Sequence, residues 1–245
     1  MTESQVTLFD CPSRFGTGTC WSPNVWKTRL LLNYKNIDYK TEWLHAPDIA
    51  PLLESFGIPP HTSKFEMVPY TLPAVRLPDN TYVMESSSIS RKVEAMYPEP
   101  SVDLDSPLQE EVQRALNKIM VRLAPVLVPR MPRETLSGVS IQYHRQARRK
   151  TFGMSLEEFE DRFGGDKAWK KAEPYLRQLA DILKANTDGP FCMGAKPTYA
   201  DFLIVAFLEW CVCLRGPNFD RIVDIDRSFS DVYMACKPWL ARNDH

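Results

Sequence analysis

The sequence lacks any long apolar run, any excess of one charge and any paired metal-binding cysteines. No segment reaches the roughly 18 consecutive apolar residues that identify a membrane-spanning helix, so no membrane association is expected. The 30 Lys and Arg residues nearly balance the 31 Asp and Glu residues. Because a nucleic-acid-binding domain typically has a basic surface, this balance argues against a nucleic-acid partner. The first residues also lack the pattern of a secretory signal.

Common catalytic and metal-binding motifs are missing as well. The sequence has no Gly-rich phosphate loop, no His-Glu-x-x-His helix and no Gly-x-Ser-x-Gly turn. The six cysteines include no Cys-x-x-Cys pair, so neither disulfides nor zinc are expected, and a reducing, cytoplasmic compartment fits best. The four histidines are too scattered for a metal cluster and are interpreted as surface residues: His45, His61, His144 and His245.

The length of 245 residues corresponds to one large or two small domains, and a hydrophobic content of 44% is ordinary for a globular protein. Short β-rich runs alternate with amphipathic helical segments in the N-terminal part. The predicted strands are Val6–Phe9, Asp38–Leu44, Leu72–Leu77 and Tyr82–Met84. The predicted helices start at Ser22-Pro23, span Pro47–Phe56 and span Ile89–Tyr97. The expected order is therefore β-α-β-α-β-β-α.

The pattern changes after Tyr97, where a stretch with two prolines and no hydrophobic period indicates a linker. The rest of the chain is predicted to be helical, with a long apolar stripe that begins at Leu108. The segment Phe202–Leu214, preceded by a capping-box pattern at Thr198, is apolar on all sides and predicts a buried helix. The sequence thus divides into an α/β domain at 1–97, a linker at 98–105 and an all-helical domain at 106–245.

Three short motifs are candidates for chemistry. Ser22 precedes Pro23 at a predicted helix start, where unpaired backbone N–H groups favour an anion such as a thiolate. Ser22 also suits a purely structural role as an N-cap, and so does Glu85-Ser86 at a later helix. At Leu72-Pro73, a cis prolyl bond would turn the Leu72 N–H and C=O outward, where they can pair with the backbone of a ligand.

Taken together, the spacing of these motifs resembles the glutathione transferase family over nearly the whole chain. The segments that carry the resemblance are Val6–Phe9, Ser22-Pro23-Asn24-Val25-Trp26-Lys27-Thr28-Arg29, Tyr70-Thr71-Leu72-Pro73-Ala74-Val75, Glu85-Ser86 and Thr198-Tyr199-Ala200-Asp201. The runs 21–29 and 149–158 look most like the fungal-specific class related to bacterial β-etherases, which includes enzymes of natural-product pathways.

The resemblance implies a thioredoxin-like N-terminal domain, a helical C-terminal domain and a homodimer. It implies that glutathione is bound by Asn24, Lys64, Leu72, Pro73, Glu85 and Ser86. Glu85 and Ser86 would hold the γ-glutamyl group, and Leu72 beside a cis Pro73 would pair with the cysteinyl backbone. Lys64 would hold the glycyl carboxylate, with His61 or a backbone N–H near Tyr70 as alternatives.

Ser22 matches the family position that activates the glutathione thiol. The long loop 10–21 departs from the compact turn of most relatives, so Ser13, Thr17 or Thr19 is an alternative source of the activating hydroxyl. The same loop and the start of the helix at 107–128 are expected to form the pocket for the second substrate.

The predicted function is a glutathione transferase that adds the glutathione thiolate to a small apolar or aromatic electrophile, in a natural-product or detoxification pathway. The first alternative is a glutathione-dependent isomerase or eliminase, because Ser22 also matches the first serine of the Ser-Ser-Cys pattern of maleylacetoacetate isomerases. The second alternative is a glutathione-fold binding protein without turnover. None of these three predicted functions requires a metal.

Overall fold

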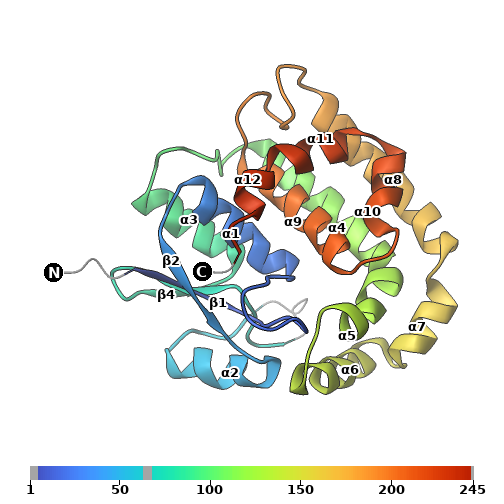
Figure 1. Ribbon diagram of the computed structural model, residues 1–245, viewed down its shortest axis with the longest axis horizontal. Helices are drawn as coiled ribbons and strands as arrows, with labels where there is room; N and C mark the ends of the chain where they lie inside the picture. Colours follow the sequence, from blue (N-terminus) through green and yellow to red (C-terminus); the bar gives the residue numbers. More distant parts are fainter. Residues whose placement is uncertain (1–4, 63–67, 244–245) are drawn as a thin grey trace.

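The computed structural model describes residues 5–62 and 68–243, which form a sheet-containing domain and a helical domain (Figure 1). The described residues of the first domain form a four-stranded sheet in the order β2-β1-β3-β4. The strands are β1 (Val6–Asp10), β2 (Tyr39–Trp43), β3 (Ala74–Arg76) and β4 (Tyr82–Met84). β1 pairs in parallel with β2 and antiparallel with β3, and β3 and β4 also pair antiparallel. This mixed sheet confirms the predicted thioredoxin-like arrangement.

Helices cover both faces of the sheet. α1 (Pro23–Tyr34) and α3 (Ser86–Met96) lie on one face, and α2 (Ala46–Ser55) lies on the other (Figure 1). α1 starts at Pro23, as the sequence predicts. Proline is favoured at the first helical position because the N–H that it lacks would have no partner there. After α2 the chain turns at Gly57, whose φ of +74° is accessible to glycine without steric cost. The predicted β-α-β-α-β-β-α order is confirmed.

The helical domain is built around α9 (Tyr199–Cys213), which packs against α4 (Pro107–Leu127) and α1. Nearly every side chain of α9 is buried, which confirms the helix predicted to be apolar on all sides. α8 (Asp166–Lys184) packs along α4. The remaining helical segments are η1 (Val128–Arg130), α5 (Met131–Glu134), α6 (Val139–Phe152), α7 (Leu156–Phe163), α10 (Asn218–Ile225), α11 (Ser228–Ala235) and α12 (Lys237–Leu240). Within the described ranges, no helix is long and apolar enough to span a membrane.

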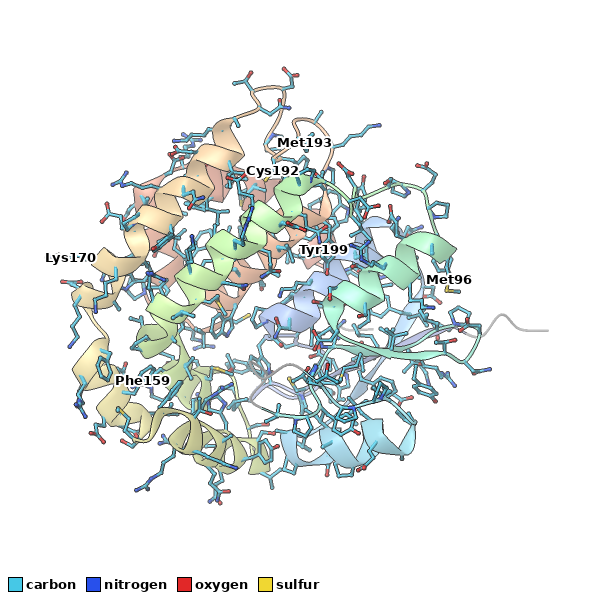
Figure 2. All side chains as sticks on the ribbon, turned by 180° about the vertical axis from the view of Figure 1, so that it is seen from behind. Met96, Phe159, Lys170, Cys192, Met193 and Tyr199 are labelled. Atoms are coloured by element: carbon cyan, nitrogen blue, oxygen red, sulfur yellow. The ribbon has the colours of Figure 1, made fainter. Side chains whose placement is uncertain are left out.

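The start of α9 joins the two domains. Asp201 accepts a hydrogen bond from the Thr198 N–H at 2.7 Å and completes the predicted capping box. Tyr199, labelled in Figure 2, donates its hydroxyl to the Ser86 carbonyl at 3.1 Å, and its N–H donates to the Val102 carbonyl at 2.8 Å. These bonds fix the start of α3 against the helical domain.

A fully buried ion pair fixes α1 to the sheet. Arg29 of α1 contacts the carboxylate of Asp10, the last residue of β1, at 3.0 Å, and neither side chain is exposed. The Arg29 guanidinium also donates to Thr41 on β2 at 2.9 Å and lies over the Trp43 ring. Since a buried charge without a partner is very unfavourable, the pair holds α1 in one position on the sheet.

Replacement of Asp10 tests this role. Asp10→Asn leaves the Arg29 charge buried without a counter-ion, so the free energy of unfolding should fall by about 3–5 kcal/mol. Urea unfolding followed by circular dichroism measures the loss. Asp105→Asn is the matched control, because Asp105 pairs with Arg91 at the surface and should cost less than about 1 kcal/mol. An equally small loss for both variants would contradict the role of the buried pair.

Candidate active site

A cavity of about 600 Å³ lies between the start of α1, the segment before β3, the start of α3 and one side of α4. It brings together the predicted glutathione-binding residues Asn24, Leu72, Pro73, Glu85 and Ser86. Three further residues of the α/β domain, which the sequence analysis did not single out for the site, also line it: Lys27, Thr71 and Ser87. Lys27 follows Asn24 by three residues on α1, so the helical period was a signal that could have identified it.

Lys27 places a cation in this cavity. Its ammonium donates to the Asn24 side-chain oxygen at 2.9 Å. Burial lowers the pKa of Lys27, and the nearby Glu85 carboxylate partly opposes that shift. The cavity therefore contains groups of both charges, as a zwitterionic ligand would require.

Glu85 occupies an unusual backbone position. It is the N-cap of α3 with a φ of +82°, a region that a residue with a side chain rarely adopts. Its carboxylate accepts a hydrogen bond from the Thr71 hydroxyl at 3.1 Å and lies 3.1 Å from the His61 ring. Such backbone strain costs about 1–3 kcal/mol and is concentrated at functional sites, which favours a binding role for this carboxylate.

The segment before β3 presents backbone groups to the cavity. The Leu72–Pro73 peptide bond is cis, as the resemblance implies. The Leu72 N–H and C=O make no hydrogen bond with any described residue, while the Pro73 carbonyl accepts from the Glu85 N–H at 3.2 Å. Leu72 therefore has a donor and an acceptor available at the cavity wall.

Ser22 is the N-cap of α1, as predicted, but its hydroxyl does not cap the helix. The residue is 9% exposed, and its carbonyl accepts the Trp26 N–H at 2.9 Å. Within the part of the chain that the structure describes, the hydroxyl has no hydrogen-bond partner, so the structural role considered above does not occupy it. Ser22 does not line the cavity, but Asn24, two residues further along the chain, does.

The alternative activating groups on loop 10–21 are placed differently. Ser13 is buried, and its hydroxyl is used within a turn, where it donates to the Gly16 carbonyl and accepts from the Phe15 N–H. Thr17 is exposed and Thr19 is half-buried. No residue of this loop lines the 600 Å³ cavity, and its part in a pocket for the second substrate stays a prediction.

The start of α4 lines the cavity with polar side chains, including Gln109, Gln113 and Asn117. One further expectation needs correction. His61 is not a surface residue, because its side chain is 8% exposed and contacts Thr71 and Glu85. The predicted carboxylate ligand Lys64 lies outside the described residues.

The other histidines also differ in placement. His45 is exposed as expected, whereas His144 is buried, and burial lowers its pKa to about 4. His245 lies outside the described residues. Over residues 5–62 and 68–243, no group of three or more His, Cys, Asp or Glu side chains is arranged to hold a metal ion.

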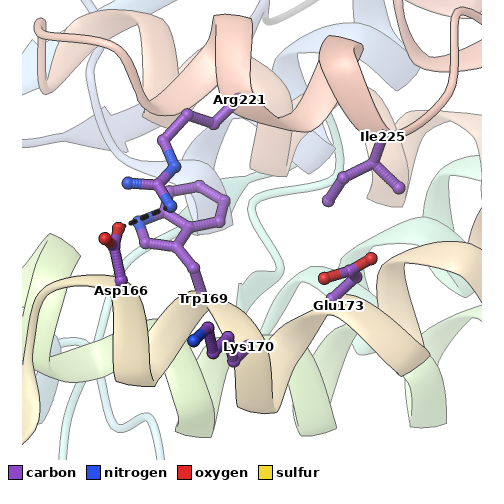
Figure 3. A pocket seen from close by; sticks show the side chains of 6 residues that line it. All are labelled: Asp166, Trp169, Lys170, Glu173, Arg221 and Ile225. Atoms are coloured by element: carbon purple, nitrogen blue, oxygen red, sulfur yellow. Dashed lines mark hydrogen bonds and ion pairs between the residues drawn. The ribbon is translucent and has the colours of Figure 1, made fainter.

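A second cavity of about 340 Å³ lies between α8 and α10 (Figure 3). Its charged groups neutralise one another: Arg221 contacts Asp166 at 2.9 Å and lies over the Trp169 ring. No predicted site residue lines it. The larger cavity is therefore the candidate site for the chemistry predicted from the sequence.

Comparisons with known proteins identify the family to which the chain is similar. The N-terminal and C-terminal domains of glutathione S-transferase match residues 21–96 and 107–239. A glutathione S-transferase-like protein of Aspergillus flavus, UstS, is 32% identical over 97% of this chain and 92% of its own length. A glutathione S-transferase of Ceriporiopsis subvermispora, crystallised with glutathione, is 29% identical with a TM-score of 0.84, covering 96% of this chain and 98% of that chain. Glutathione transferase GSTFuA3 of Phanerochaete chrysosporium shares the fold, with a TM-score of 0.86 at 24% identity over 97% and 98% of the two chains.

The positions of the cysteines predict low thiol reactivity. All six are free, and burial raises the pKa of each one. For Cys20, two residues before Ser22, the Asp10 carboxylate raises the pKa further.

Alkylation with iodoacetamide at neutral pH tests this placement. Because the thiolate is the reactive form, each thiol of the folded protein should react at least about tenfold more slowly than in the urea-unfolded protein, which is the control. Rapid labelling of Cys20 in the folded protein, located by peptide mass spectrometry, would instead identify it as a reactive thiolate.

Proposed function

The chain belongs to the glutathione S-transferase family, and on this premise we propose that it is an enzyme that binds glutathione in the 600 Å³ cavity and adds its thiolate to a small electrophile. The observation that carries the proposal is the convergence of Asn24, Leu72, Glu85 and Ser86, from three separate segments, on one cavity. The relative crystallised with glutathione supports the choice of ligand.

Each part of the cavity suits one part of glutathione. The Glu85 carboxylate complements the ammonium of the γ-glutamyl group, and Ser86 at the start of α3 complements its carboxylate, because helix N-termini favour anions. The N–H and C=O of Leu72, which make no hydrogen bond within residues 5–62 and 68–243, suit the cysteinyl backbone. Lys27 and Asn24 provide further donors on the same wall.

Ser22 is the proposed activating residue. A thiol with a pKa of about 8.5 is only about 3% thiolate at neutral pH, and the thiolate is the nucleophile. Lowering that pKa by about 2 requires about 2.7 kcal/mol of preference for the anion. A hydroxyl hydrogen bond to a charged group contributes roughly 1.5–3 kcal/mol, and the helix N-terminus adds about 0.3–1 kcal/mol. Ser22 and the start of α1 are sufficient together, without a general base.

The second substrate is proposed to be small and apolar or aromatic, as in a natural-product or detoxification pathway of the fungal-specific class. Phe15, an apolar side chain that is 58% exposed on the loop preceding Ser22, supports this choice. The six free cysteines support a cytoplasmic location. A homodimer is proposed from the family resemblance alone.

The same site would also serve a glutathione-dependent isomerase or eliminase, since both reactions begin with thiolate attack. A binding protein without turnover would instead leave the bound thiol protonated at neutral pH. The pH at which the bound thiol ionises therefore separates the enzymes from the non-catalytic alternative.

Ser22→Ala tests the activation. Loss of the hydroxyl should raise the pKa of the bound glutathione thiol by about 1–2 while glutathione affinity stays within a few-fold, because only the ionised form loses a hydrogen bond. Ultraviolet absorbance of the bound thiolate as a function of pH measures this shift. Thr17→Ala, at an exposed threonine of the preceding loop, is the control and should leave the titration unchanged. A titration of Ser22→Ala identical to that of the wild type would refute the role of Ser22.

Glu85→Gln tests the γ-glutamyl site. Removal of the carboxylate charge should weaken glutathione binding by about tenfold or more, because the ligand ammonium then lacks its counter-ion. Calorimetry measures the affinity, and Glu54→Gln on the exposed side of α2 is the control. Unchanged affinity in Glu85→Gln would exclude this assignment.

A further inference from the structure

Three side chains beside the cavity form a hydrogen-bonded chain that the family resemblance does not assign. The Nε2 atom of His61 lies 2.8 Å from the Thr71 Oγ1 atom, and Thr71 Oγ1 lies 3.1 Å from Glu85 Oε1. The His61 side chain is 8% exposed, whereas that of Glu85 is 40% exposed. The same Nε2 atom also lies 3.1 Å from Glu85 Oε1, so the buried imidazole and the Thr71 hydroxyl both contact one oxygen of a carboxylate at the cavity wall.

The direction of these hydrogen bonds follows from the chemistry of the groups. An ionised carboxylate only accepts, so the single Thr71 hydroxyl proton is donated to Glu85. Thr71 must then accept from His61, which requires the proton of a neutral imidazole to reside on Nε2. Among the described residues nothing bonds the second carboxylate oxygen of Glu85, so that oxygen is available to a ligand.

The backbone supports this arrangement from both sides. The Glu85 N–H donates to the Pro73 carbonyl, and the His61 N–H donates to the Pro69 carbonyl at 2.8 Å. Lys27 is a cation near Glu85, and its ammonium donates to the Asn24 side-chain oxygen. An unrestrained glutamate side chain would lose considerable rotamer freedom on binding a ligand, so restraint before binding increases affinity.

We propose that Thr71 and His61 are positioning residues that hold the Glu85 carboxylate ready for a primary ammonium, and that they thereby select ligands with a free γ-glutamyl amino group. This inference rests on the proposed glutathione function and deepens it. Neither residue needs to touch the ligand for this effect, because both act through Glu85.

Calorimetry with two ligands tests the proposal: glutathione, and its analogue in which hydrogen replaces the γ-glutamyl amino group. Thr71→Val should weaken glutathione binding about tenfold, because the variant keeps the shape of threonine but cannot donate. The same variant should bind the deamino analogue as the wild type does. Thr71→Ser, which retains the hydroxyl, should restore glutathione affinity to within about twofold of the wild type.

Three calorimetric outcomes would overturn the positioning role: unchanged glutathione affinity in Thr71→Val, equal losses for both ligands, or failure of serine to restore affinity. If the wild type binds no glutathione, the proposed function itself fails. If the wild type binds glutathione but one of these three outcomes occurs, only the positioning role fails, so the two failures are distinguishable.

Nitrogen-15 NMR of the ligand-free protein tests the hydrogen-bond chain independently of glutathione. The chain requires a neutral His61 to carry its proton on Nε2, and Thr71→Val should shift that signal. A neutral His61 protonated on Nδ1 would overturn the chain even if the glutathione results were as expected.

Discussion

The buried contact between Asp10 and Arg29 holds α1 in one position on the sheet, and the proposed site depends on that position. Both side chains are fully buried at 3.0 Å, and the pair joins the end of β1 to the second turn of α1. Because a helix is rigid over this length, the pair also determines where Ser22 and Asn24 lie. The Asp10 carboxylate has a second effect, since it and burial together raise the pKa of the Cys20 thiol. The reactive sulfur at this site is therefore expected to come from the ligand rather than from the chain.

Glu85, by contrast, is held in a strained backbone conformation at the wall of the cavity, where we propose that it binds the ligand. Its positive φ costs about 1–3 kcal/mol, and the segment around it offsets that cost with the bonds from its N–H to Pro73 and from Thr71 to its carboxylate. Tyr199 then fixes the adjoining Ser86 carbonyl from the helical domain. Residues of both domains therefore hold the N-terminus of α3 in place, and the cavity lies where the two domains meet.

Local sequence signals predicted the elements but not the contacts between distant segments. The Ser22-Pro23 pair predicts a helix start from two adjacent residues, and the uniformly apolar stretch in α9 predicts a buried helix from its own composition. Both helices form as expected. His61 has no such signal, because its role depends on a fold that brings residues 61, 71 and 85 together. Loop 10–21 is similar, since its conformation depends on the bond from the Arg14 N–H to the distant Thr135 carbonyl. The polar side of α4 was missed because the apolar period identifies only the buried face.

The most direct test of the account is the position of glutathione in a crystal structure of its complex with this protein. The account predicts the ligand in the 600 Å³ cavity, with its ammonium on Glu85, its carboxylate at the start of α3 and its sulfur within hydrogen-bond distance of the Ser22 hydroxyl. Glutathione bound elsewhere, or bound in this cavity with its sulfur directed away from Ser22, would contradict it.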